Sequence, residues 1–131
     1  MFDALIEGII NLWSVNSLLL LVAGSAVGLL FGAIPGLGGT TAVALLIPLT
    51  FGMEPWQAII LMGGVMAATS TGGSVSAILL NTPGIAPNAA TTFDGYPLAQ
   101  QGKAGMAIGA GATSSAVGLS LIHISEPTRP Y

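Results

Sequence analysis

The stretch Gly32-Ala-Ile-Pro-Gly-Leu-Gly-Gly-Thr-Thr41 interrupts an otherwise apolar chain. A second such stretch follows it: Gly72-Gly-Ser-Val-Ser-Ala-Ile-Leu-Leu-Asn-Thr-Pro-Gly84. Both are rich in glycine and free of charge. Irregular backbone in a bilayer exposes N–H and C=O groups that lipid cannot pair, so it persists only where protein buries it or where it lines a wet cavity. Two such breaks in one short apolar chain predict a solute site within the membrane, as in proteins built from discontinuous helices.

The composition supports a membrane location. Charged residues make up only 5% of the chain, against roughly 25% in a soluble domain. No charge lies between Glu7 and Glu54 or between Glu54 and Asp94, and each gap exceeds the roughly 20 residues that cross a bilayer. The apolar runs are continuous, whereas a transmembrane barrel needs alternating strands. We therefore predict an all-α integral membrane protein, a multi-span helical bundle with broken or re-entrant helices in a lipid bilayer. The net charge of -3 argues against nucleic acid as a partner.

The first half of the chain predicts one span, a break and a second helix. Residues 17–34 form the first span, whose glycines recur every fourth residue on one helical face and allow another helix to approach closely. Pro35 then ends it, because proline lacks an N–H and restrains the residue before it. We expect Thr40 or Thr41 to cap the next helix, which Pro48 kinks or ends.

The second half predicts a further span at 56–70, followed by a polar, uncharged segment at 69–74 that we expect to be unwound. Residues 75–80 are too few to cross a bilayer, so they suit a half-helix or re-entrant segment. Residues 85–102 are expected to form a long polar loop, and another span begins at Lys103.

The last residues differ from the rest of the chain. Residues 119–131 contain a sudden polar cluster with the only His and the only Arg, and they resemble the translation of a transposon adapter used in sequencing libraries. We therefore predict that the natural sequence ends near Gly118 and that residues 119–131 are a non-native tail. A natural polar tail is the alternative. If residues 119–131 are a non-native tail, His123 and Arg129 have no function.

The reactive side chains of an enzyme are missing from the sequence. Outside 119–131 there is no His, Cys or Arg, and the spacing around Ser74 is not that of a hydrolase nucleophile because Ser76 replaces the closing glycine. No metal-ligand spacing is present. We therefore predict no enzyme activity, no metal and no resident cofactor. A site made of backbone dipoles, hydroxyls and amides suits an anionic solute at helix N-termini, or a cation held by oxygen atoms.

The two glycine-rich stretches also carry a family resemblance. Gly28-x-x-x-Gly32-x-x-Pro35-Gly-Leu-Gly38 resembles the first signature of the large membrane subunit of tripartite tricarboxylate transporters, the TctA family. The stretch from Gly72 to Gly84, followed by Asp94-Gly-Tyr96 and Lys103-Ala104, is similar to its second signature. The resemblance covers the chain to about Gly118, and it implies that residues 1–118 are the N-terminal part of a transporter's transmembrane domain, roughly the first quarter of a longer subunit.

The resemblance implies a multi-pass secondary transporter of the bacterial inner membrane. It would import tricarboxylates or related carboxylates, driven by a Na⁺ or H⁺ gradient, together with a small membrane subunit and a periplasmic solute-binding protein. The alternatives are a membrane scaffold or assembly subunit packed through glycine stripes, and a channel. The signature positions and the backbone beside them give the candidate solute- and ion-binding residues: Pro35, Gly36, Gly38, Gly39, Thr40, Gly72, Gly73, Ser74, Asn81, Thr82, Pro83, Gly84 and Asp94.

Overall fold

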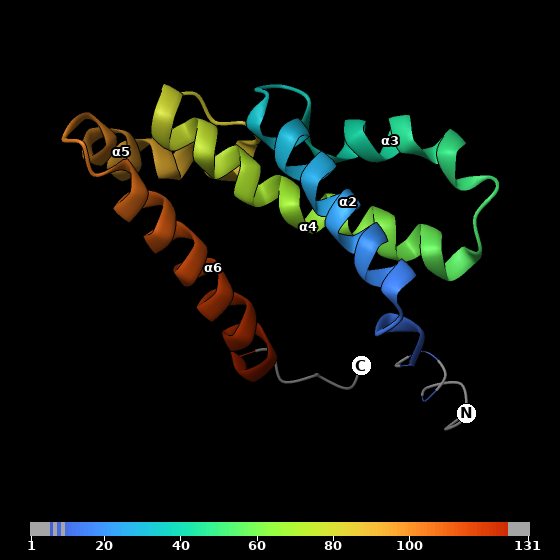
Figure 1. Ribbon diagram of the computed structural model, residues 1–131. Helices are drawn as coiled ribbons and strands as arrows, with labels where there is room; N and C mark the ends of the chain where they lie inside the picture. The colour runs from blue at the N-terminus through green and yellow to red at the C-terminus, as the bar shows by residue number, and fades with distance from the viewer. Residues whose placement is uncertain (1–5, 7, 9, 126–131) are drawn as a thin grey trace, which may run out of the picture.

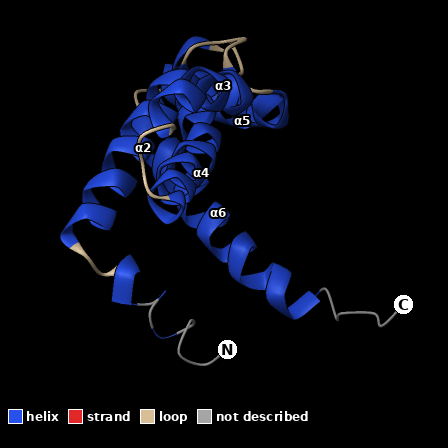
Figure 2. Ribbon diagram, turned by 90° about the vertical axis from the view of Figure 1, so that its right-hand side faces the viewer, coloured by secondary structure: helices blue, strands red, loops and turns tan. Residues whose placement is uncertain are grey.

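The computed structural model describes the backbone of residues 6, 8 and 10–125, and every residue in this part that belongs to a regular element is helical (Figures 1 and 2). The elements are α2 (Val15–Ala33), α3 (Gly38–Thr50), α4 (Pro55–Leu80), the short 3-10 helix η1 (Ala86–Asn88), α5 (Ala89–Gln100) and α6 (Ala104–Ser125).

Three of these helices are long and apolar enough to cross a membrane: α2, α4 and the part of α6 from Ala104 to Leu121. Helix α3 has 13 residues and therefore spans only about 20 Å, less than the roughly 30 Å hydrocarbon core of a bilayer. The prediction of an all-helical membrane protein is confirmed. The predicted first span and the break after it are also confirmed, because α2 ends at Ala33 and Pro35 lies in the turn that precedes α3.

Helices α2 and α4 run parallel and in contact along most of α2 (Figure 1). Gly24 lies against Leu61, and four residues later in both helices Gly28 lies against Val65. A Cβ atom at either glycine would collide with the carbonyl oxygen of the residue it faces. The contacting pairs move toward the C-terminus in both helices, so α2 and α4 point in the same direction. Helix α3 and the turns beside it return the chain between them.

The contact is two-sided, since α4 also contributes glycines. A Cβ on Gly64 would lie 3.1 Å from the carbonyl oxygen of Leu21, and one on Gly72 would collide with the backbone of Leu29. In a bilayer no hydrophobic force drives helices together, so close van der Waals packing of small residues has to hold them. We call this set the glycine ladder: Gly24, Gly28, Gly32, Gly64 and Gly72.

The predicted unwinding of residues 69–74 is wrong, as is the separate half-helix at 75–80. Both segments belong to α4, which is continuous to Leu80. The hydroxyls serve the helix itself: Thr69 Oγ1 donates to the carbonyl of Val65 at 2.7 Å, and Ser74 Oγ donates to that of Ser70 at 3.2 Å. Gly72 is used for close packing against α2 and not for a break.

The expected polar loop at 85–102 is also wrong, because η1 and α5 occupy it. Helix α5 packs on the end of α4 through Gly95, where a Cβ would lie 2.7 Å from Ile78 Cγ1. Sequence alone does not show that Gly95 is buried in this contact.

Two other expectations need correction or stay open. Helix α3 begins at Gly38 without a side-chain cap, so Thr40 and Thr41 do not cap it, and it continues past Pro48 to Thr50. Helix α6 passes through Gly118 to Ser125, and residues 126–131, including Arg129, lie outside the described part. The boundary at Gly118 stays a prediction.

Candidate functional site: a glycine junction between the two signature stretches

The two glycine-rich stretches meet in space at the end of α2 (Figure 1). Beyond Leu80 the chain turns at Asn81, which adopts a left-handed conformation with φ 55°, and then folds back toward α4. The N–H of Gly84 donates to the carbonyl of Gly73 at 3.4 Å, and the N–H of Gly36 donates to the carbonyl of Gly84 at 3.4 Å. These long backbone hydrogen bonds connect α4, the returning segment and the turn after α2.

The absence of side chains makes this meeting possible. A Cβ on Gly84 would collide with the carbonyl oxygen of Gly32 and would lie 2.7 Å from the Cα of Gly73. Gly36 has open space around it, but its φ of +88° is one that L side chains rarely adopt. We call the set Gly32, Gly36, Gly73 and Gly84 the glycine junction.

Asn88, in η1, secures the junction, and it is not among the site residues expected from the sequence. Its side chain is only 5% exposed, and its Nδ2 donates to the carbonyl of Ser70 at 2.8 Å. On the other side of the junction, Ser76 Oγ donates to the carbonyl of Gly73 at 3.1 Å. The one signal for Asn88 in the sequence is an amide directly before Ala89-Ala90, where α5 begins although a polar loop is expected there.

Several candidate residues form an exposed rim around the junction. Pro35, Gly36 and Thr40 are exposed on the side of the first stretch, and Asn81 and Thr82 are exposed on the side of the second. Gly38 and Gly39 begin α3, whose N-terminal end has no side-chain cap. The first N–H groups of a helix lack partners within it and favour anions. The rim therefore offers backbone donors and neutral amide and hydroxyl groups.

The remaining candidates have other positions. Gly39 is buried, and a Cβ there would lie 3.0 Å from Met66 Sδ, so it packs α3 on α4. Gly72 belongs to the glycine ladder, and Pro83 is half-buried in the returning segment. Ser74 lies on α4 toward α6. Asp94 is exposed on α5, and within the described residues no hydrogen bond or ion pair joins its side chain to the junction.

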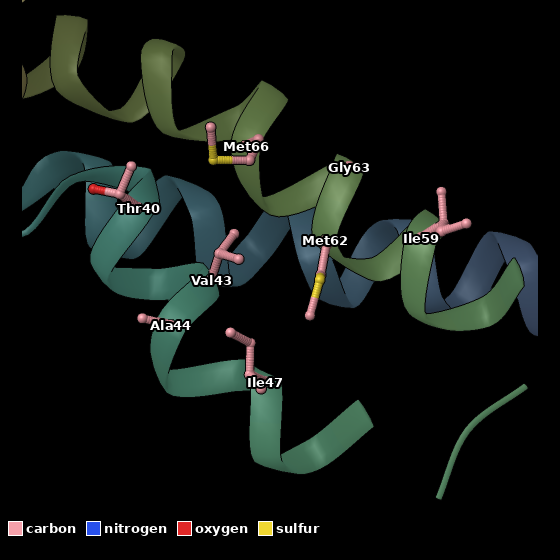
Figure 3. A pocket seen from close by; sticks show the side chains of 8 residues that line it. All are labelled: Thr40, Val43, Ala44, Ile47, Ile59, Met62, Gly63 and Met66. Atoms are coloured by element: carbon pink, nitrogen blue, oxygen red, sulfur yellow. The ribbon is translucent and has the colours of Figure 1, made fainter. Parts of the chain in front are cut away.

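A groove of about 580 Å³ runs between α3 and α4 (Figure 3). Its walls are mainly apolar, and Thr40 places a hydroxyl at one end (Figure 3). An apolar wall cannot compensate a carboxylate for the loss of water, so the groove suits apolar groups and not a charged solute. Its lining residues are Thr40, Val43, Ala44, Ile47, Ile59, Met62, Gly63 and Met66.

The fold and the junction define an integral membrane protein built on apolar helices with a backbone-lined break. A family model described as the tripartite tricarboxylate transporter TctA family matches residues 18–125. The chain therefore belongs to the TctA family, which confirms the resemblance of its two signatures. The matched range crosses Gly118, but it does not test the predicted boundary there.

The chain is also similar to an uncharacterized 52.8 kDa protein in the TAR-I ttuC' 3' region of Agrobacterium vitis. The two are 38% identical over 108 residues, which cover 79% of this chain and 22% of that protein. The chain thus spans between a fifth and a quarter of the length of this curated relative. No solved structure matches the chain.

Proposed function

We propose that this chain forms the N-terminal part of the membrane subunit of a secondary transporter that imports tricarboxylates or related carboxylates. Membership of the TctA family supports this proposal. The observation that carries it is the glycine junction, where two stretches far apart in sequence meet through the backbone beside an uncapped helix start.

In this proposal the rim of the junction holds the carboxylate groups of the solute. The N–H groups at the start of α3, near Gly38 and Thr40, face the negative charge, as helix N-termini do in other anion sites. Asn81 and Thr82 add an amide and a hydroxyl from the second stretch. Neutral donors suit a transporter, because they bind an anion less tightly than a buried, fixed positive charge would and so allow its release.

The proposal includes partners and a driving force. A periplasmic solute-binding protein delivers the carboxylate, a small membrane subunit completes the complex, and an ion gradient drives uptake across the bacterial inner membrane. The word tripartite in the family's description supports the partner subunits. The rest of the longer subunit supplies the helices that enclose the pathway.

Uptake of radiolabelled citrate tests the proposal in vesicles that contain the full-length subunit, the small subunit and the binding protein. We expect Asn81→Gly to raise the half-saturating citrate concentration about tenfold, because it removes an amide donor to a charged group while it keeps the left-handed turn. Gly38→Leu should abolish uptake, since Gly38 has a φ of +61°.

Gly109→Ala is the matched control, because a Cβ there meets nothing within 4 Å; it should transport normally. Normal uptake by both Asn81→Gly and Gly38→Leu would remove the site. No uptake by the unaltered complex, under any ion gradient, would favour the scaffold alternative.

A further inference from the structure

The charged residues of the described part of the chain lie at the two ends of the α2–α4 pair. Glu54 is the N-cap of α4, whereas Asp94 belongs to α5, at the other end of the pair, and Lys103 directly precedes α6 (Figure 1). All three are exposed, and α2, α3 and α4 themselves contain no Asp, Glu, Lys or Arg. Because a charged side chain in the middle of a bilayer is costly, the two ends are the parts of this pair that reach water.

Large aromatic side chains surround the end where Glu54 lies. Trp13 lies just before α2 and is 79% exposed, and Phe51, in the turn after α3, is 85% exposed. Trp56, in the first turn of α4, lines a cavity of about 200 Å³ together with Leu12, so the starts of α2 and α4 lie at one level. Tryptophan is enriched where a bilayer meets water. This end therefore fits the first membrane–water boundary.

The lengths of the two helices set the depth of the glycine junction. Helix α2 has 19 residues and spans about 28 Å, so Gly32 in its last turn lies about one hydrocarbon thickness from Trp13. Along α4, Gly73 lies about 25 Å from Trp56. The hydrocarbon core is about 30 Å thick. We infer that the glycine junction lies within about 5 Å of the second membrane–water boundary, with its rim open to water, and not at the midplane.

Helix α5 leads from the level of the junction into water at this second boundary. Asn88, directly before α5, donates to the carbonyl of Ser70 at 2.8 Å. Gly95 packs against Ile78, which lies about 12 Å further along α4 than Ser70. The chain therefore rises past the junction as α5 proceeds, and it reaches Lys103 after the exposed polar residues that end this helix.

A junction at the midplane would be costly at both ends of the pair. The first turns of α2 would then project into water with Leu18 and Leu19, and Leu19 is 63% exposed. Apolar area left in water costs about 25 cal/mol per Å². The same shift would bring Asp94 into the hydrocarbon core. Discontinuous helices commonly place a solute site near the midplane, so the depth inferred from these helices differs from what the breaks alone predict.

The depth also assigns a role to the rim, and this step rests on the proposed function. A carboxylate that reaches Thr40 and Asn81 at the boundary keeps part of its hydration shell, whereas at the midplane it would lose that shell entirely, at a high cost. The rim is therefore the place where the solute passes between water and the subunit.

The test measures depth in the full-length subunit with its partner subunits, in lipid nanodiscs that leave both faces open to reagents. Single cysteines replace Val15, Val22 or Ile34, which are all exposed, in a background without other cysteines, and each carries a nitroxide label. Power-saturation EPR gives the depth of each label. We expect Val22→Cys at about 15 Å from the nearer boundary, and Val15→Cys and Ile34→Cys within about 5 Å of one.

Helix α4 supplies a second series, which decides the matter where Ile34→Cys does not fold. Ile59, Met66 and Leu80 are exposed on α4, and the label at Met66→Cys should be the deepest of the three. A label at Ile34→Cys that lies deeper than the one at Val22→Cys, with Val15→Cys in water, would overturn the placement. In the second series, a label at Leu80→Cys that lies deeper than the one at Met66→Cys would overturn it as well.

A labelling experiment tests the role of the rim. Saturating citrate should slow the reaction of Ile34→Cys with a membrane-impermeant maleimide severalfold and leave that of Val15→Cys unchanged. No protection by citrate, beside normal uptake, would remove the role of the rim as the entrance. The expected depths without any citrate uptake would support the placement and count against the proposed function. A deep label at Ile34→Cys beside normal uptake would overturn the placement and leave the proposed function standing.

Discussion

Gly84 packs against the carbonyl oxygen of Gly32 so closely that no side chain fits between them. Gly32 lies in the last turn of α2 and Gly84 belongs to the segment that returns from α4, so this contact joins the two signature stretches of the chain. The contact is made by backbone alone. A substitution here changes the distance between the two stretches without the loss of any functional side chain.

The contact predicts that Gly84→Ala lowers both stability and transport. The added Cβ would collide with Gly32 and would lie 2.7 Å from the Cα of Gly73, and forced overpacking of this kind costs about 1–3 kcal/mol. Thermal unfolding in detergent micelles measures the loss. Gly105→Ala is the control, because its Cβ meets nothing within 4 Å; it should gain about 0.5–1 kcal/mol from its helix position. Equal unfolding temperatures for the two variants would contradict this packing.

Structural features that adjacent residues determine could be predicted from the sequence. Pro35 ends α2 because its ring and its missing N–H act on the adjacent residues, whatever the rest of the fold does. The long uncharged runs likewise predicted the spans. The segment at 69–74 could not be predicted in this way, because the sequence does not distinguish a glycine that packs a continuous helix from one that breaks it. Only the backbone of Leu29, which contacts Gly72 across the interface, shows which role this glycine has.

The site was predictable only in part. The motifs selected Gly36, Gly73 and Gly84, which the structure brings together. Their mutual contact depends on the reversal at Asn81, a tertiary feature. Asn88 was missed because its role depends on reaching the carbonyl of Ser70 across the junction, and nothing in the adjacent sequence indicates that partner.

The glycine ladder predicts opposite effects for two alanine substitutions. Gly28→Ala would place a Cβ against the backbone of Val65, and it should destabilise the protein by about 1–3 kcal/mol. Gly63→Ala on α4 meets nothing within 4 Å and should stabilise by about 0.5–1 kcal/mol. Thermal unfolding of both variants under one set of conditions gives the comparison. Two changes of the same sign would show that α2 and α4 are not packed in this register.

Asn88 predicts a difference between buried and exposed amides. Asn88→Asp replaces the Nδ2 donor by a carboxylate oxygen that faces the carbonyl of Ser70, and a buried polar group left without its partner costs about 1–3 kcal/mol, or more when it is charged. The same change at exposed Asn81 should stay within about 0.5 kcal/mol. Chemical denaturation in micelles at neutral pH measures both. A smaller loss at Asn88 than at Asn81 would remove its structural role.

Asn81 predicts a way to separate backbone geometry from solute binding. Its φ of 55° lies in the left-handed region, which costs a branched residue about 1–2 kcal/mol. Asn81→Val should therefore destabilise the protein by that amount, whereas Asn81→Gly, which adopts the conformation freely, should unfold at or near the temperature of the unaltered protein. If Asn81→Gly nevertheless weakens citrate uptake, the amide contributes directly to binding. If both variants lose stability equally, the turn at Asn81 is held by its side chain and not by its conformation, and the amide would have no separate role to assign.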